Sequence, residues 1–484
     1  MRRRTFLQAS ATISAASLFP GLAGAATDTG AQQGWSIGFN GVTDDLPVRS
    51  MTLEGSIPEA CFGTLYRNGP ALYKRNGQRY QHWFDPDGMI QAFRLGPEGI
   101  SHSGRFVRSR KYLREEQAGR FLFNGAGSVF PDSVGVRNNE DTNAANINVL
   151  PFDGELLALW EAGSPYRVDP VSLETKGQRH WSDDLAGVPF SAHPHFDDRG
   201  DLWNIGAASF ASRPVLVLYH IGRNGRLLKY RAQPLETMGY MHDFVLTDEY
   251  LVALNSSALM QHGESFVDRM TWTPSRPSEL LFFQRSDFTL ARRIEVPPSF
   301  VFHFGNAWKE AERVCFTACE YADDRLATKT MFQLAQQAPG AATPDSELVR
   351  YSVDVVSGHV EKTALGVDLE FPTFDGRRPF TAQALFGVAS GRSENAGLSG
   401  SVVRVNPRTG ASARFDYGKD VIVEEAQWVP GPDGGFLVHS FLNVREQRSG
   451  VAVLRAQALA DGPVGVASMD RVLPLGFHGC FVPA

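Results

Sequence analysis

Four histidines stand in dense apolar or aromatic surroundings and are the strongest candidates for chemistry in this chain. They are His193, His242, His303 and His478. Phe302 and Phe304 flank His303, so on a strand its imidazole faces the side opposite to both rings. An imidazole buried there needs a hydrogen bond or a metal, because an unsatisfied buried polar group is costly. Each histidine alone is more often a hydrogen-bonded core residue than a ligand, so only the set of four indicates a metal site.

The elements that would hold these side chains are short strands. Clusters of Asp, Asn, Pro and Gly, such as residues 84–88, recur along the chain and favour tight reversals. The apolar runs between them, such as residues 155–160 and 250–254, have strand length rather than helix length. This pattern predicts an all-β fold, and its persistence along the chain favours a β-propeller. No sharp repeat is visible, so the blades have diverged.

The spacing of the four histidines fits such a ring. Their separations are 49, 61 and 175 residues. If seven blades share the mature chain, each takes about 66 residues. The separations then correspond to one, one and three blades, as expected for ligands that meet on the axis. The sequence places five other histidines beside turns or polar neighbours and predicts that they are solvated: His102, His180, His220, His262 and His359.

Two stretches lack the strand pattern. Residues 109–130 are predicted to be a loop or a helical insertion, and residues 324–346 a surface excursion. The first stretch contains the apolar groups 121–123 and 129–130. These residues either touch a membrane at a substrate entrance or are buried under a blade, and the sequence leaves both readings open.

Composition restricts the class of protein. The chain has 484 residues with 47 basic and 53 acidic side chains, and 43% of its residues are apolar, as in an ordinary globular protein. The net charge of −6 gives no support to nucleic-acid binding, which usually needs a basic face. Four cysteines are too few for a disulfide scaffold. For Cys315 and Cys319, four residues apart in an apolar run, packing is favoured over a metal or redox pair.

The N-terminal segment has the features of an export signal. Arg2, Arg3 and Arg4 precede an apolar stretch that is too short to span a membrane, and Ala23-Gly24-Ala25 offers small residues for cleavage. We therefore expect residues 1–25 to be a twin-arginine-type signal peptide, residues 26–484 to be a single domain, and the protein to be periplasmic. An uncleaved anchor is the alternative. Twin-arginine systems export folded proteins, often with a metal already inserted.

Several segments together resemble the carotenoid cleavage oxygenase family, which includes apocarotenoid oxygenases, lignostilbene dioxygenases and the retinal pigment isomerohydrolase. The matching segments are Leu65-Tyr66-Arg67-Asn68-Gly69-Pro70, His82-Trp83-Phe84-Asp85-Pro86-Asp87-Gly88-Met89, Ala192-His193-Pro194, His242-Asp243-Phe244, His303-Phe304-Gly305-Asn306-Ala307-Trp308 and Gly476-Phe477-His478-Gly479. They run through most of the chain, and their combination is highly specific.

The resemblance implies a fold and a cofactor. The expected fold is a seven-bladed β-propeller, with loop or helical insertions that cap the active-site face. One Fe(II) per chain would lie on the axis, held by His193, His242, His303 and His478. His82 belongs to a structural motif of the family, and His195 does not match the ligand position, so neither is assigned to iron.

The family also places three glutamates around its histidines, and the matches here are Glu161, Glu370 and Glu425. A carboxylate that accepts the far ring N–H fixes the tautomer of a metal-bound imidazole and adds negative charge beside the metal. Ala426 stands where the family usually has proline, and Glu424 is adjacent to Glu425.

The implied activity is that of a dioxygenase. O2 would add across one conjugated C=C bond of a carotenoid or apocarotenoid, a lipophilic substrate held in an apolar tunnel, to give two carbonyl products. Trp160 stands where stilbene-cleaving members have a lysine that helps to deprotonate a phenol, and an indole cannot act as a base. Trp160 is therefore predicted to line the substrate site and favours a polyene, with Tyr112 the only candidate for the partner tyrosine. The alternatives are a stilbene-cleaving dioxygenase, an isomerase that uses the same iron, a non-catalytic propeller and a propeller with a quinone cofactor. Peripheral membrane contact is a further possibility, and no oligomeric state is predicted.

Overall fold

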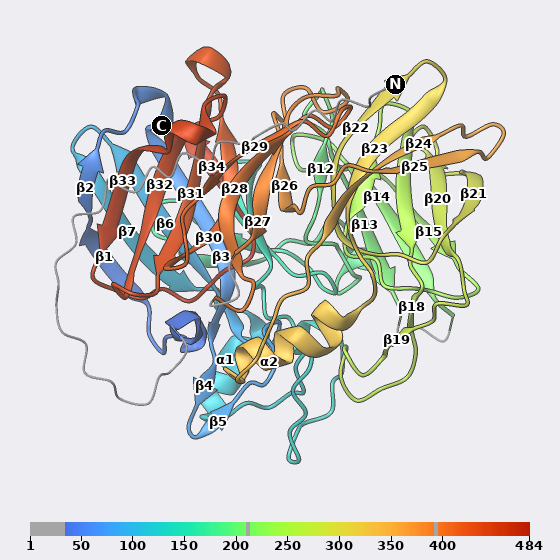
Figure 1. Cartoon of the computed structure of the whole chain (residues 1–484). Helices are drawn as coiled ribbons and strands as arrows, with labels where there is room; N and C mark the ends of the chain where they lie inside the picture. The colour runs from blue at the N-terminus through green and yellow to red at the C-terminus, as the bar shows by residue number, and fades with distance from the viewer. Residues whose placement is uncertain (1–33, 210–212, 392–394) are drawn as a thin grey trace, which may run out of the picture. The chain divides into compact units, whose positions relative to one another are not determined.

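The computed structural model describes residues 34–209, 213–391 and 395–484 (Figure 1). All of these residues belong to one compact unit. The predicted signal peptide, residues 1–25, lies outside the described residues. Within the described ranges, no helix has both the length and the apolar character that a membrane span requires.

The described strands form seven sheets of four or five strands, each a propeller blade, and two small hairpins. The first four blades, with the innermost strand first, are blade 1, β34 (Gly479–Pro483), β3 (Gly63–Leu72), β6 (Asp87–Gly96), β7 (Gly99–Phe106) and β1 (Leu46–Ser50); blade 2, β8 (Asn148–Phe152), β9 (Glu155–Leu159), β10 (Tyr166–Val168) and β11 (Thr175–Gln178); blade 3, β12 (His195–Phe196), β13 (Leu202–Ala208), β14 (Val215–Ile221) and β15 (Leu227–Pro234); and blade 4, β16 (Phe244–Leu246), β17 (Tyr250–Asn255), β20 (Ser278–Gln284) and β21 (Leu290–Val296).

The other three blades and the hairpins complete the strand set. They are blade 5, β22 (Phe300–Glu310), β23 (Arg313–Tyr321), β24 (Glu347–Val353) and β25 (Val360–Ala364); blade 6, β26 (Glu370–Thr373), β27 (Leu385–Ser390), β28 (Ser399–Val405) and β29 (Ser412–Asp416); blade 7, β30 (Val421–Val429), β31 (Phe436–Asn443), β32 (Arg448–Arg455), β33 (Pro463–Met469) and β2 (Thr52–Gly55); and the hairpins β4 (Lys74–Arg75) with β5 (Gln78–Arg79), and β18 (Ala258–Met260) with β19 (Met270–Trp272). The predicted seven-bladed propeller is confirmed.

The innermost strands contact one another around the ring: β16 with β22, β22 with β26, β26 with β30, β30 with β34, and β34 with β8. Inner strands such as β16 are buried along their whole length, whereas the outer strand β15 is mostly exposed. Residues on inner strands therefore converge on the axis, which is where a propeller can assemble side chains from distant parts of the sequence.

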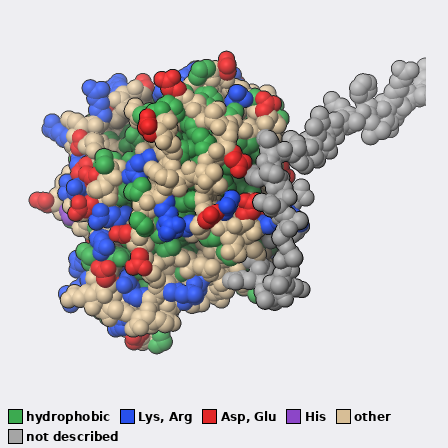
Figure 2. Space-filling model, turned by 90° about the vertical axis from the view of Figure 1, so that its left-hand side faces the viewer, with side chains coloured by type: hydrophobic (Ala, Val, Ile, Leu, Met, Phe, Trp, Pro, Cys, Tyr) green, Lys and Arg blue, Asp and Glu red, His purple; other side chains and the backbone are tan. Residues whose placement is uncertain are grey.

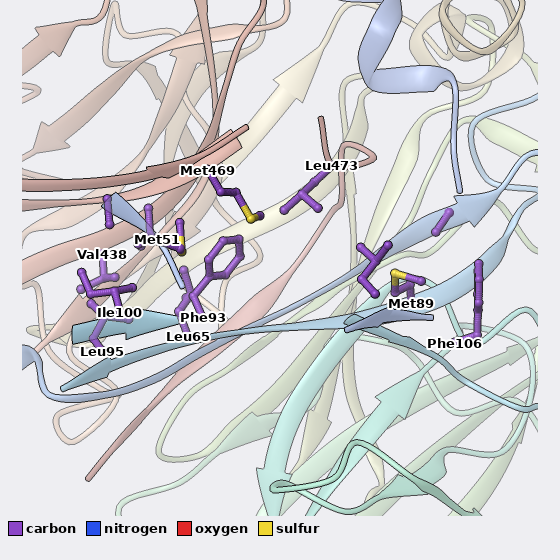
Figure 3. Packing of buried hydrophobic residues seen from close by; sticks show 14 of the residues in the cluster. Met51, Leu65, Met89, Phe93, Leu95, Ile100, Phe106, Val438, Met469 and Leu473 are labelled. Atoms are coloured by element: carbon purple, nitrogen blue, oxygen red, sulfur yellow. The ribbon is translucent and has the colours of Figure 1, made fainter. Parts of the chain in front are cut away.

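The ring is closed by strands from both parts of the chain. In blade 1 the late strand β34 pairs with the early strand β3, and in blade 7 the early strand β2 pairs with β33, so red and blue strands lie side by side in Figure 1. A large apolar cluster spans these two blades: Leu65, Met89 and Phe93 of blade 1 pack with Val438 and Met469 of blade 7 (Figure 3).

The helices are short: η1 (Gly34–Phe39), η2 (Glu59–Cys61), α1 (Arg110–Ala118), η3 (Asn139–Asp141), η4 (Asp183–Leu185), the π-helix η5 (Leu326–Thr330), α2 (Met331–Ala335), η7 (Pro432–Gly434) and η8 (Leu459–Asp461). The predicted insertion at 109–130 contains α1, whose first turn is capped by Ser109, since its side chain accepts a hydrogen bond from Tyr112 N. Gly119 ends the helix in the left-handed region, with φ 66°.

The open question about the apolar groups of this insertion has a partial answer. Phe121, Phe123 and Phe130 are buried, and Phe121 and Phe130 pack on Tyr80. Val129 remains exposed. The phenylalanines therefore anchor the insertion to the core of blade 1.

Two predictions were wrong. Residues 324–346 are not simply a surface excursion: η5 and α2 bury Leu326, Ala327, Met331 and Leu334 in a cluster with aromatic side chains, whereas most of residues 336–346 are exposed or half-buried. His102 is not solvated but fully buried, 3.1 Å from Gln91 Oε1. His180, His262 and His359 are exposed, as predicted, and His220 is half-buried.

All four cysteines are free. Cys315 and Cys319 are buried in β23, in agreement with packing. Over the face shown in Figure 2, basic and acidic side chains are intermixed, so that face offers no basic surface of the kind that binds nucleic acid.

Candidate metal centre

The four candidate histidines lie at the inner strands of four blades. His193 and His242 come two residues before β12 and β16, His303 lies within β22, and His478 directly precedes β34. These are blades 3, 4, 5 and 1, which are the intervals that the sequence separations predicted. All four side chains are buried, and their ligand atoms lie within 4.8 Å of one another.

Three of the imidazoles are held from behind by carboxylates. His242 Nδ1 lies 2.7 Å from Glu161 Oε2, His303 Nδ1 lies 2.5 Å from Glu370 Oε2, and His478 Nδ1 lies 2.9 Å from Glu425 Oε1. The structure thus places all three sequence-predicted glutamates against the histidines. Since a carboxylate only accepts, each Nδ1 must donate its hydrogen, and each Nε2 then presents a lone pair to the centre.

The facing Nε2 atoms test whether a metal fits. His303 Nε2 lies 3.1 Å from His478 Nε2, and His193 Nε2 lies 2.9 Å from His242 Nε2. With Nδ1–H of His303 and His478 donated to glutamates, no hydrogen is left between their Nε2 atoms, and two lone pairs face each other. A cation relieves that repulsion, and four imidazoles suit iron, zinc, copper or nickel. The donor set therefore fits the iron that the family resemblance implies.

The pKa shifts of two of the histidines agree with this use, whereas the shift of His303 has the opposite direction. Burial, reinforced by the neighbouring histidines, lowers the pKa of His193 well below its ordinary value. Burial also lowers the pKa of His478 to about 4, although Glu425 opposes the shift. For His303, burial opposes protonation, but the adjacent Glu370 outweighs it and raises the pKa. Neutral imidazole is the form that binds a metal.

A β-bulge explains why two adjacent glutamates both point inward. The pairing of β30 with β31 shifts register between Val423 and Ala426. Glu425 turns to His478, whereas Glu424 accepts hydrogen bonds from Gly476 N and Ser440 Oγ, both at 2.5 Å. Strict strand alternation would have sent the two side chains to opposite faces. The sequence alone could not show which of the two glutamates contacts a histidine, because the answer depends on this bulge.

Two side chains that support the glutamates were not singled out from the sequence. Tyr240 Oη lies 3.1 Å from Glu161 Oε2 and 2.8 Å from His242 Nδ1. Arg67, in the Leu65–Pro70 motif, donates to Glu425 Oε2 at 2.9 Å and to the carbonyl of Phe477 at 2.8 Å. The sequence did contain a signal for each of them. Tyr240 stands two residues before a candidate ligand, and Arg67 is a charged residue within an apolar strand.

The remaining histidines of these motifs face elsewhere. His82 Nε2 donates to the carbonyl of Ala327 at 2.8 Å, and its Nδ1 accepts from Phe84 N, so it fastens its motif to the π-helix η5. His195 Nε2 donates to Asp243 Oδ1 at 2.9 Å. Neither belongs to the group of four.

A cavity adjoins the histidines and is lined mainly by apolar and aromatic side chains. Its wall includes Phe302, Phe371, Phe477 and Tyr321, together with Leu326 of η5 and Met331 of α2, and Glu424 also reaches it. Phe371 lies 5.2 Å from the ring of His303, measured between ring centres. The site therefore opens into a space suited to a lipophilic molecule.

The predicted substrate-lining residue Trp160 and the candidate partner tyrosine Tyr112 both lie elsewhere in the described structure. Trp160 is half-buried against the cluster that contains Leu159 and Phe190, and it is not among the described residues that line the cavity. Tyr112 is buried on α1, where its ring stacks on Phe106.

A second group of potential ligands, Asp197, Asp201 and His220, lies in blade 3. Its members are already engaged: Asp197 Oδ2 accepts from Arg285 at 2.5 Å and from Trp203 Nε1 at 3.0 Å, and Asp201 Oδ2 accepts from His220 at 3.1 Å. The guanidinium of Arg285 already supplies the positive charge that a metal ion would bring, so this group of three side chains is structural.

Comparisons with known proteins agree with this geometry. The family model described as retinal pigment epithelial membrane protein matches residues 39–483. The chain is 27% identical over 484 residues to the apocarotenoid-15,15'-oxygenase of Synechocystis, covering 92% of this chain and 96% of that protein. It is 27% identical over 461 residues to the isoeugenol monooxygenase of Pseudomonas putida, covering 90% of this chain and 94% of that protein. The structure of cobalt-substituted Synechocystis ACO has the same fold, with a TM-score of 0.81 at 24% identity, over 94% of this chain and 99% of that one.

Proposed function

The chain belongs to the retinal pigment epithelial membrane protein family, and on this premise we propose that it is an iron(II)-dependent dioxygenase. It cleaves one conjugated C=C bond of a carotenoid or apocarotenoid into two carbonyl products. The observation that carries the proposal is the convergence of four buried histidines beside an apolar cavity. The similarity to an apocarotenoid-15,15'-oxygenase supports the substrate class.

His193, His242, His303 and His478 would hold one Fe(II) per chain. Iron(II) supplies the activation of O2 when it is bound. Glu161, Glu370 and Glu425 keep three of the imidazoles in the tautomer that offers Nε2 to the metal, and their negative charges offset the charge of the ion.

The cavity holds the organic substrate in position beside the histidines. Its aromatic walls, including Phe302 and Phe371 close to the histidines, exclude water and hold a planar conjugated chain by its faces. Leu326 of η5 and Met331 of α2 also line the cavity, so these two helices would cover the bound polyene. Binding is therefore dominated by apolar contact rather than by charge.

A stilbene or phenylpropanoid substrate is the second candidate, because relatives of this chain are named isoeugenol monooxygenase and resveratrol cleavage oxygenase. The polyene is favoured because Trp160 occupies the position of the phenol-activating lysine. The test compares kcat/KM for an apocarotenal with kcat/KM for a 4-hydroxystilbene such as resveratrol. Faster cleavage of the hydroxystilbene, with loss of rate when its 4-hydroxyl is methylated, would assign the enzyme to the phenolic branch.

Product identification decides between an oxygenase and the other readings. Fe(II)-loaded protein should convert an apocarotenal into two shorter carbonyl compounds, identified by mass spectrometry, with oxygen incorporated from 18O2. An isomerase would return a product of unchanged mass. A non-catalytic propeller would purify without stoichiometric iron and yield no product.

The location of the protein is part of the proposal. The features of residues 1–25 support export through the twin-arginine pathway to the periplasm. Exposed Leu113, Val129, Val134 and Val136, in and beyond the α1 insertion, support peripheral contact with a membrane that would deliver a lipophilic substrate. Fractionation of cells that carry an Arg3→Lys, Arg4→Lys variant tests the first point, and co-sedimentation with lipid vesicles tests the second.

A further inference from the structure

Asp243 is a buried carboxylate that neither binds the centre nor touches the cavity in the described structure, yet it is surrounded by donors from three blades. Its Oδ1 accepts a hydrogen bond from His195 Nε2 at 2.9 Å and another from Phe244 N at 2.7 Å. Its Oδ2 accepts from Phe304 N at 2.8 Å. These three hydrogen bonds therefore fix the orientation of the Asp243 carboxylate.

Each of these donors adjoins a candidate ligand in sequence. His195 stands two residues after His193, Phe244 stands two residues after His242, and Phe304 directly follows His303. The three donors come from β12, β16 and β22, the inner strands of blades 3, 4 and 5. One carboxylate thus connects the chain segments that carry three of the four histidines.

Such a connection matters because of how a propeller is built. In the described chain the sheet hydrogen bonds stay within each blade, so adjacent inner strands are not paired to each other. Their relative height along the axis is set by side-chain packing and by links between blades. Apolar packing tolerates small shifts, whereas three hydrogen bonds to one carboxylate have directions and lengths that do not.

We propose that Asp243 is a positioning residue, which sets His193, His242 and His303 at the mutual distances that a metal requires. His478 is placed separately, through Glu425 and Arg67. The inference rests on the proposed metal centre and adds to it. The His195–Asp243 pair sets the geometry of the ligands, and neither of its members is a ligand.

The substitution Asp243→Asn changes one atom and leaves the volume nearly unchanged. An amide offers one acceptor oxygen and an NH2 group, so either Phe304 N or the pair of His195 and Phe244 donors then faces another donor. His195→Gln and His195→Ala form the second pair of variants, because the Gln amide can donate from the position of Nε2 and Ala cannot.

Asp201→Asn is the matched control. Asp201 also accepts from a histidine Nε2, that of His220 at 3.1 Å, and from a backbone N–H, that of Arg223 at 3.0 Å, but it lies outside the centre. Any general cost of replacing an Asp–His pair in blade 3 should appear in this variant as well.

The probe is Co(II), bound to the metal-free protein and followed by its visible absorption and by competition with a chelator. We expect Asp243→Asn and His195→Ala to weaken Co(II) binding by about 10-fold or more, in the range typical of outer interactions at metal sites, and to alter the absorption spectrum. His195→Gln should restore affinity to within about 2-fold of the wild type, and Asp201→Asn should lower Tm without changing the affinity or the spectrum.

Equal Co(II) affinity and spectra for Asp243→Asn and Asp201→Asn would overturn the inference, as would His195→Ala with wild-type binding. Failure of the proposed function looks different: Co(II) binding would follow the expected order while the Fe(II) form cleaved no polyene. A wild-type protein that bound no Co(II) would contradict both.

Discussion

Arg67 of blade 1 and Glu425 of blade 7 form an ion pair across the junction where the ring closes, with Nη1 and Oε2 2.9 Å apart and both side chains almost completely buried. Burial opposes the charge of Glu425, but His478, Arg67 and the Gly479 N–H together lower its pKa. The pair holds the carboxylate that in turn holds His478.

Arg67→Met should therefore be strongly destabilising. It leaves Glu425 charged and buried without its cation, a change that typically costs about 3–5 kcal/mol of unfolding free energy. Urea unfolding of the metal-free protein measures the loss. Arg445→Met, which removes an exposed partner 3.8 Å from Asp420, is the control and should cost less than about 1 kcal/mol. Equal losses of unfolding free energy in the two variants would mean that the buried Arg67–Glu425 pair contributes no more to stability than an exposed pair.

Loss of any one of the four histidines should abolish both iron binding and turnover. His303→Ala removes the ligand whose Nε2 faces His478, so the centre loses one of its four donors. Iron content by atomic absorption and product formation should both fall to background, whereas the exposed His180→Ala should match the wild type. Full iron and activity in His303→Ala would refute the four-histidine assignment.

Replacing a supporting glutamate should have a smaller effect. Glu370→Gln keeps an acceptor for His303 Nδ1 but removes the negative charge, and we expect metal affinity or activity to fall by about 10–100-fold. Glu161→Gln and Glu425→Gln should behave similarly. Chelator competition and kcat measured on the same samples separate weaker binding from slower chemistry. A Glu370→Gln enzyme identical to the wild type would remove that carboxylate from the centre.

His102 should contribute to the acid sensitivity of the fold. Burial, followed by the charges of Arg471 and Arg94, lowers the pKa of His102 to about 3 from its ordinary 6.5. Below pH 6.5 the unfolded chain takes up this proton while the folded chain does not, so the free energy of unfolding falls as the pH is lowered through that window. The limiting slope is about 1.4 kcal/mol per pH unit. His102→Gln cannot titrate, so the wild type should lose stability relative to this variant in urea titrations between about pH 6.5 and about pH 4. Parallel curves would show that His102 titrates normally.

The four histidines and the ring were predictable because both leave long-range signals: blade-length separations, and strands broken by turns. The burial of η5 and α2 was not, since alanine-rich polar segments resemble surface loops until the aromatic residues that receive them, such as Trp83 and Tyr321, are placed. His102 was misjudged because its polar neighbours in sequence alternate to the other face of β7. The roles of Glu424 and Glu425 depended on a bulge, which only the register of β30 against β31 reveals.

The pairing of β34 with β3 also dictates an order of events during synthesis. Arg67 and Phe477, which meet in this junction, are 410 residues apart, so nearly the whole ring must leave the ribosome before His478 can join the other three histidines. Contacts between such distant residues form late in folding, because the chain must first lose the entropy of a very long loop. Stoichiometric metal binding would therefore mark the closed ring, because a nascent or truncated chain that ends before His478 contains only three of the four candidate ligands.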